Sequence, residues 1–354
     1  MKKVLVCFDG TGNEPGDADP ELNDQGTFDD ENISNVLKLH LRAGGRLGAP
    51  AGAPGQLSLY FTGPGTRGGL LRRVVETGFA PKSLEKIKDQ ALAQLRDVHE
   101  PGDEISVFGF SRGAAIARRF VSHLQTLGLA DNEKDTQPGR RVPVRFMGIW
   151  DTVLSEGIPE KNQHIRDPAE LGEDTGIGPD VERVFHLVSI DDPRKLFTPT
   201  LFVPDDRVSE VWFPGVHSDV GGGYRQAGLS DIALEFMIEQ AIEEAGLTFF
   251  EPDEVEVALA SGGLVDPDDL RSRPDETADD HAQDFEKFLK EFSDVLGPRK
   301  VMALRGGVPV LHMSVVERGR KRQYRPRNLR NLRHTIWGQA NTEHEGFACH
   351  FNDD

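Results

Sequence analysis

One serine of this chain lies between two glycines, at a point where a strand pattern gives way to a helix pattern. Gly109, Ser111 and Gly113, within the stretch VFGFSRGAA, fit the pattern G-x-S-x-G. In a nucleophile elbow, a serine at the end of a strand turns directly into a helix. Glycines two residues before and after it avoid collisions with the neighbouring strand and helix. The pattern therefore predicts that Ser111 is a nucleophile, against the alternative of a tight turn that happens to contain a serine.

A serine hydroxyl needs a base to react at neutral pH, usually a histidine oriented by a carboxylate. Around an elbow these partners follow in the order serine, acid, histidine, each at the carboxyl end of a later strand. Asp151 follows the strand-like run VRFMGIW, and His217 lies in the loop after VSEVWF. We therefore predict Asp151 as the acid and His217 as the base. Asp191, in VSIDDPR, is the rival acid, and Asp219 is better placed to brace the loop of His217.

The triplet HSD that contains His217 also allows an interpretation as part of a metal site. No matching cluster of His, Cys or carboxylate ligands is evident in the sequence. We therefore favour the nucleophilic interpretation and expect neither a metal ion nor another cofactor.

Acyl transfer also needs N–H donors for the developing oxyanion. One donor is expected from Arg112, the residue after the serine, and the other from the loop after the strand two before the elbow strand. That loop is DGTGN, which supplies Gly10 or Thr11 as donor and Asp9 and Asn13 to hold the turn. A phosphate-binding loop is the competing interpretation, but DGTGN lacks both G-x-G-x-x-G and a following Gly-Lys-Ser/Thr.

Apolar runs that alternate with helical periodicity must position these residues. We predict strands at 3–8, 57–61, 105–110, 144–150 and 208–213. Helical spacing of apolar residues follows the first three of these runs. Such alternation indicates an α/β fold with a mostly parallel sheet, helices on both faces, and the elbow at its carboxyl edge.

The domain organisation follows from the same pattern. We predict a single domain over 1–335 and a C-terminal tail over 336–354. The loop-rich stretch 155–180 and the acidic stretch 251–300 interrupt the alternation and are interpreted as insertions. The second insertion is either a solvated surface segment or a lid over the site, because lids are usually insertions of this sort.

Composition limits the classes of function. The 354 residues carry a formal net charge of −18, which disfavours a nucleic-acid-binding surface. The apolar run at the N-terminus ends at Asp9, too short for a secretory signal, and no window approaches the roughly 20 apolar residues of a membrane span. We therefore expect no integral membrane segment and a cytoplasmic chain.

Several motifs occur together in a fixed order. They are FDGTGN, ENISNVLKL, GFSRGAA, GIWDTV, HLVSIDDPRKLFTP, WFPGVHSDVGGGY, LHMSVVERG and YRPRNL. In this order they resemble the uncharacterised α/β-hydrolase family that includes the class-one phospholipase effectors of type VI secretion systems. The resemblance runs from about residue 3 to about residue 330, with gaps over the two insertions.

The resemblance implies a function and roles for named residues. It implies an α/β-hydrolase fold in which Ser111 is the nucleophile, Asp151 the acid and His217 the base. It further implies a serine esterase or lipase, with phospholipid as the ester substrate, export by a type VI system, and a delivery or immunity protein as partner. The alternatives are a catalytically inactive binding module and an esterase for small or sugar acyl esters.

Overall fold

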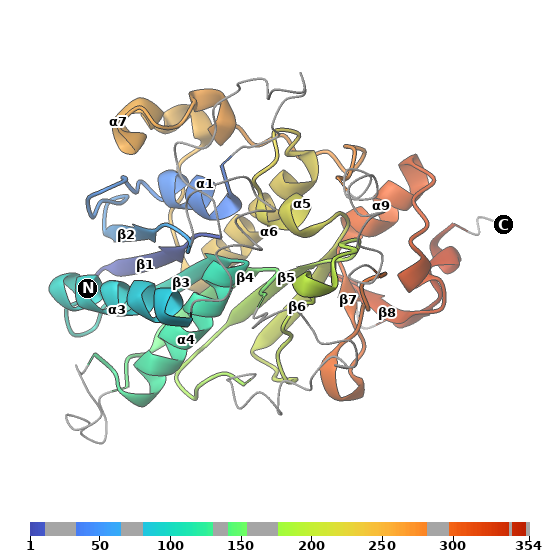
Figure 1. Cartoon of the computed structure of the whole chain (residues 1–354), viewed down its shortest axis with the longest axis horizontal. Helices are drawn as coiled ribbons and strands as arrows, with labels where there is room; N and C mark the ends of the chain where they lie inside the picture. Colours follow the sequence, from blue (N-terminus) through green and yellow to red (C-terminus); the bar gives the residue numbers. More distant parts are fainter. Residues whose placement is uncertain are drawn as a thin grey trace.

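The computed structural model describes residues 1–10, 33–64, 81–129, 141–153, 176–281, 297–339 and 342–351. Within these ranges the strands are β1 (Lys3–Phe8), β2 (Gln56–Phe61), β3 (Glu104–Phe110), β4 (Val144–Trp150), β5 (Val184–Ser189), β6 (Val208–Phe213), β7 (Val310–Leu311), β8 (Arg333–Ile336) and β9 (His344–Glu345). They form one sheet in the order β2-β1-β3-β4-β5-β6-β7-β8-β9, with β2 and β8 toward opposite ends of the molecule (Figure 1). Among the described strands, only β8 and β9 pair antiparallel.

The principal helices among the described residues follow or separate these strands. They are α1 (Asn35–Arg42), α3 (Pro81–Val98), α4 (Arg112–Thr126), α5 (His217–Gly221), α6 (Gly228–Ala245), α7 (Val257–Ser261) and α9 (Met313–Lys321). Capping fixes where α1 begins, because the Ser34 side chain accepts a hydrogen bond from the Leu37 N–H. The predicted mostly parallel α/β architecture is confirmed.

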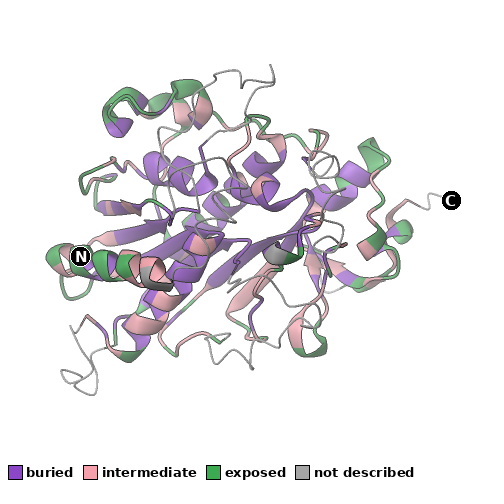
Figure 2. Cartoon of the chain, in the orientation of Figure 1, coloured by how far each residue is buried: buried purple, intermediate pink, exposed green. Residues whose placement is uncertain are grey.

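Alternating side chains divide the core into two layers, one on each face of the sheet. Val4, Val6 and Phe8 of β1 face α3 and α4, whereas Leu5 and Cys7 face α1 and α6. The two helix pairs lie on opposite sides of the strands in Figure 1. Figure 2 shows the central strands buried and the outer surface of α3 exposed. Burial on both faces explains why these strands are almost continuously apolar.

Five of the strands agree with the sequence-based predictions to within one residue, but β5 was not predicted. The run VFHLVS holds a buried histidine and is flanked by charged loops, so it gave no clear strand signal. The strand predicted as the fifth is β6. The short strands β7, β8 and β9 were also not predicted, since two to four residues are too few for a periodic pattern.

A few apolar residues of the acidic insertion pack on the body of the protein. Its α7 contributes Val257 and Ala260 to an apolar cluster with Ile33, Leu37 and Leu41, at and around α1. The stretch FEKFLKEF and most of the insertion predicted at 155–180 lie outside the described residues. The residues predicted as a tail contain β9 and the 3-10 helix η10 (Phe347–His350), and Phe347 is buried in a third core cluster. Among the described helices, none is both long and apolar enough to cross a membrane.

Candidate active site

Ser111 occupies a strained corner between β3 and α4. Its φ of 57° and ψ of −122° lie in a region that side chains disfavour, which costs on the order of 1–3 kcal/mol. A Cβ at Gly109 would lie 2.7 Å from the carbonyl oxygen of Gly113. A Cβ at Gly113 would collide with the carbonyl oxygens of Phe8 and Asp9 at the end of β1. Both glycines therefore allow α4 to begin directly beside the neighbouring strand.

The His217 imidazole is hydrogen-bonded to Asp151. Its Nδ1 lies 2.6 Å from Oδ2 of the carboxylate, although the two residues are 66 positions apart in the sequence. Asp151 follows β4, next to β3 in the sheet, and His217 comes after β6. Because parallel strands end at one edge of a sheet, both residues reach the edge that carries Ser111. His217 was predicted in a loop; it is the first residue of the short helix α5.

His217 lies beside the serine corner. The ring of Phe110, the residue before Ser111, has its centroid 4.6 Å from that of His217 and packs on Gly221 of α5. Burial lowers the pKa of His217, although the hydrogen bond to Asp151 opposes that shift. The imidazole is therefore neutral at pH 7, the state in which a base accepts a proton.

The Asp151 carboxylate is fully buried and accepts hydrogen bonds from several directions. Arg299 Nη1 lies 2.6 Å from Oδ1, and the Ser189 N–H donates to the same oxygen at 3.1 Å. Burial alone would raise the pKa of this carboxyl. The Arg299 charge and the His217 hydrogen bond nevertheless hold the pKa of Asp151 below its usual value. Asp151 is thus ionised and oriented toward the imidazole.

A second aspartate holds the backbone of His217. Asp192 Oδ2 accepts the His217 N–H at 3.1 Å, and its carboxylate is also paired with Arg194, with 2.6 Å between Nη2 and Oδ2. Burial opposes ionisation, but the Arg194 charge holds the pKa of Asp192 well below its usual value. Arg194 in turn stacks over Phe197, whose ring contacts the imidazole edge-on at 4.8 Å.

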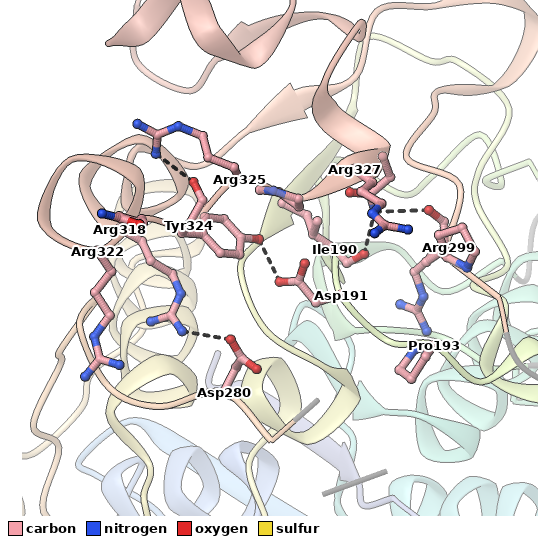
Figure 3. Close-up of a pocket in the computed structure, with 14 residues that line it drawn as sticks. Ile190, Asp191, Pro193, Asp280, Arg299, Arg318, Arg322, Tyr324, Arg325 and Arg327 are labelled. Carbon is pink, nitrogen blue, oxygen red and sulfur yellow. Dashed lines mark hydrogen bonds and ion pairs between the residues drawn. The ribbon is translucent and has the colours of Figure 1, made fainter. Parts of the chain in front are cut away.

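The rival acid Asp191 is directed elsewhere. Its Oδ2 accepts hydrogen bonds from the Tyr324 hydroxyl at 2.6 Å and the Gly215 N–H at 2.7 Å. It lines a cavity of about 670 Å³ together with Arg318, Arg322, Tyr324, Arg325 and Arg327, and Figure 3 shows the Tyr324 hydroxyl aimed at its carboxylate. Burial raises the pKa of Asp191 to about 7. The structure therefore brings Asp151, and not Asp191, to the imidazole of His217.

Asp219 stabilises the turn that carries His217. Its Oδ2 accepts the Val216 N–H at 2.9 Å, and its Oδ1 lies 2.6 Å from Nδ1 of His281. The His281 ring stacks on Tyr224 with centroids 3.7 Å apart. These contacts link α5 to the described end of the acidic insertion.

The loop after β1 adjoins the elbow, as Gly113 packs against the carbonyls of Phe8 and Asp9. Asp9 is buried and accepts hydrogen bonds from the Ser34 and Tyr60 hydroxyls at 2.8 and 2.5 Å. The N–H of Gly10, a predicted oxyanion donor, is directed instead at Oδ1 of Asp9, at 2.6 Å. Thr11 and Asn13 lie outside the described residues.

Sequence reasoning missed three residues of this site, namely Ser189, Asp192 and Arg299. Asp192 stands next to Asp191 in the motif already noted, and the doubled aspartate was its only signal. Arg299 lies 148 positions from the carboxylate that it contacts, within a stretch interpreted as an insertion. No local pattern connects such residues.

The sheet and this edge define the class of protein. A mostly parallel sheet covered on both faces, an elbow serine after β3, and a His–Asp pair after later strands are the arrangement of an α/β-hydrolase. The sheet order also reverses at β1 and β3, so Asp9 and Gly10 after β1 and the elbow after β3 flank the point where ligands bind in open α/β sheets.

The chain belongs to the family of type VI secretion phospholipase effectors described as "Tle1-like, catalytic domain". The family model matches residues 2–138 and 130–240, which contain the elbow, Asp151 and His217. This agrees with the resemblance seen in the motifs.

Individual relatives are distant. An uncharacterised protein of Saccharomyces cerevisiae, YEL023C, is 27% identical over 250 residues, which cover 57% of this chain and 33% of that protein. An uncharacterised Pseudomonas aeruginosa protein of known structure is 20% identical with a TM-score of 0.46, over 84% of this chain and 51% of the other. The Tle1 effector bound to the VgrG spike is 23% identical with a TM-score of 0.39, over 63% of this chain and 51% of the effector chain. The chain thus spans a third to about half the length of these relatives.

Proposed function

We propose that this chain is a serine hydrolase that cleaves carboxylic esters, with Ser111 as nucleophile, His217 as base and Asp151 as acid. The observation that carries the proposal is the 2.6 Å hydrogen bond between His217 and the ionised Asp151, beside a serine at a strained strand–helix corner. An ionised aspartate fixes the imidazole with its proton on Nδ1, which leaves Nε2 to accept a proton.

The reaction then proceeds in two halves. His217 Nε2 takes the Ser111 hydroxyl proton as Oγ attacks the ester carbonyl, and Asp151 stabilises the imidazolium that forms. Collapse of the tetrahedral intermediate transfers that proton to the leaving alcohol and leaves an acyl-enzyme. A water molecule, deprotonated by His217, releases the acid and regenerates Ser111.

The oxyanion needs preorganised donors beside Oγ. The Arg112 N–H, in the first turn of α4, is proposed as one donor. The second donor is proposed to be the N–H of Gly10 or of Thr11. If Gly10 is the donor, its N–H must turn away from the Asp9 carboxylate. Losing one such donor typically costs about 2.7–4 kcal/mol of transition-state stabilisation.

Phospholipid is the proposed ester class. Its support is membership of a phospholipase effector family, matched over the part of the chain that holds the elbow, acid and base. A panel of phospholipids beside p-nitrophenyl esters of graded chain length tests this assignment. Turnover of long acyl chains and phospholipids supports it, whereas activity confined to acetyl or sugar esters contradicts it. The same family membership predicts export by a type VI system and a delivery or immunity protein as partner, to be sought by affinity capture.

A fluorophosphonate probe tests the chemistry separately from the substrate. We expect covalent labelling of folded wild-type protein at Ser111 and none in Ser111→Ala. Ser106→Ala is the matched control, since Ser106 is a buried serine of β3, the strand that leads to Ser111. It should label like wild type. Failure of the folded wild-type chain to label would instead favour a binding module without catalysis.

A further inference from the structure

Imidazole and thiol side chains gather at the C-terminal edge of the sheet. His334 lies on β8, and Cys349 and His350 lie in η10. One ligand atom from each of the three side chains lies within 4.8 Å of those from the other two. In the order of strands, β3 with its elbow and β8 are separated by four strands. This cluster is therefore separate from the candidate active site.

Hydrogen bonding fixes the tautomer of His334. Its Nδ1 lies 2.9 Å from the carbonyl oxygen of Leu332, which can only accept, so the ring proton is on Nδ1. The neutral ring then presents an unprotonated Nε2 toward His350, whose Nε2 lies 2.7 Å away. A backbone carbonyl on one ring nitrogen is the usual way in which a protein orients a histidine that binds metal through the other.

A third histidine adjoins the cluster. His344 is paired with His334 across β8 and β9, and their rings stack with centroids 5.6 Å apart. The His344 ring is 4.6 Å from that of His350. Its Nε2 is buried and makes no hydrogen bond to any other described residue. Buried polar atoms normally have a hydrogen-bond partner, and a metal ion bound nearby would give the His344 nitrogen a partner.

We propose that His334, Cys349 and His350 bind a zinc ion, with His344 beside the fourth position. Two imidazoles and a thiolate are the donors that zinc prefers, and no carboxylate belongs to the group, which disfavours calcium or magnesium. Two nitrogens that bind one tetrahedral zinc ion at about 2.0–2.1 Å lie about 3.4 Å from each other. The Nε2 atoms of His334 and His350 must therefore move apart to that distance when zinc binds. Cys349 binds as thiolate and releases its proton to solvent.

Such an ion would be structural. It would join β8 to η10, adding to the burial of Phe347, the hydrogen bond from the Gly346 N–H to the Leu332 carbonyl and the stacking of Arg325 on Phe351. Cys349 is exposed and the helix is only four residues long, so the helix has little stability of its own. The ion should therefore stabilise the C-terminal segment without taking part at Ser111.

The test uses the full chain without a histidine tag, stripped with a chelator and then titrated with Zn²⁺ or Co²⁺. We expect about one ion per chain, a rise in Tm, and for Co²⁺ the visible bands of a tetrahedral site with thiolate charge transfer. Cys349→Ser should abolish the thiolate band, and His350→Gln should weaken Zn²⁺ binding about tenfold or more. Both residues are at least partly exposed, so these variants should fold.

His99→Gln is the matched control, because His99 lies just after α3 and away from the cluster. It should bind zinc like wild type. Failure of the stripped wild-type chain to bind either ion overturns the proposal, as does unchanged binding by both Cys349→Ser and His350→Gln. Fluorophosphonate labelling of Ser111 should be the same with and without zinc, so the outcome is independent of the proposed hydrolase activity.

Discussion

Arg299 donates a hydrogen bond to Oδ1 of Asp151 at 2.6 Å, while the other oxygen of the same carboxylate receives His217 at 2.6 Å. Arg299 also donates to the carbonyl oxygens of Ser189 and Phe197. Phe197 in turn packs against the His217 ring. One buried guanidinium thus connects Asp151 with the Phe197 ring that packs against His217. We propose that Arg299 is a positioning residue, because none of its described contacts is with Ser111.

Removing Arg299 should weaken both stability and turnover. In Arg299→Gln the buried Asp151 loses its counter-charge, which costs about 3–5 kcal/mol when one partner of such a pair is removed. We expect kcat to fall about tenfold or more with little change in KM, because the substitution disturbs the orientation of Asp151 and His217 and not the binding of substrate. The pKa of Asp151 should rise, so the carboxylate becomes protonated sooner as the pH falls. The loss of activity on acidification should therefore begin at a higher pH than in wild type.

Arg327→Gln is the control for that variant. Arg327 lines the same cavity as Arg299 but is exposed, so its loss should leave kcat and Tm near wild type. Partial rescue of the pH profile by Arg299→Lys would assign the effect to charge. An Arg299→Gln protein with wild-type kcat and an unmoved pH profile would show that the guanidinium has only a structural role.

The identity of the acid can be tested with two substitutions of the same kind. Asp151→Asn should lower kcat by about 10⁴, because an amide favours the wrong imidazole tautomer. Asp191→Asn should leave kcat near wild type, since an amide oxygen can still accept from Tyr324 and Gly215. Steady-state kinetics of both purified variants decide the matter. Equal losses would reject the distinction drawn between the two carboxylates.

Asp191→Asn should also change how stability depends on pH. The folded-state pKa of about 7 exceeds the ordinary value of 3.8, so the folded protein binds the proton more strongly than the unfolded chain. Stability conferred by the protonated group is therefore present at low pH and is lost as pH rises toward 7. The variant should lack this loss, measured as Tm at pH 5 and pH 8. A fall in Tm between pH 5 and pH 8 of the same size in Asp191→Asn as in wild type would contradict the assignment to Asp191.

Turnover should persist into mildly acidic solution. The proposed base works only when unprotonated, and burial lowers the pKa of His217 from 6.5. Activity should therefore rise with pH along an acid limb whose midpoint lies below 6.5, and it should level off above it. The rate of fluorophosphonate labelling against pH measures this midpoint, with circular dichroism as a check that the fold survives. A midpoint above 6.5 would be inconsistent with the buried imidazole.

The elbow should tolerate no side chain at Gly113. Its Cβ would meet the backbone at the end of β1, which cannot move without disturbing the sheet, so Gly113→Ala should destabilise the fold by about 1–3 kcal/mol and abolish labelling of Ser111. Gly176→Ala is the control, since among the described residues the new methyl would meet only the Val203 side chain, at 3.9 Å. If Gly113→Ala is labelled at Ser111 as well as wild type, the corner has room for a side chain at this position and the prediction is wrong.

The sequence alone determined the features that depend on neighbouring residues. G-x-S-x-G specifies a corner because both glycines act within one strand–helix turn, and apolar runs of six or seven residues predicted β1, β3 and β4. Asp151 and His217 were predicted to lie near each other because parallel strands deliver their ends to a shared edge, and the structure brings them together. That rule needs only the order of the elements.

Only the tertiary structure decided between residues with equivalent local patterns. Asp151 and Asp191 both follow buried strands, and the sheet order and loop packing turn one toward His217 and the other toward Tyr324. The contact of Arg299 with Asp151, the Gly10 N–H directed at Asp9, and the gathering of His334 with His350 were equally hidden. Sequence periodicity reports which face of an element is buried, whereas the direction of a hydrogen bond depends on side chains that distant segments bring together.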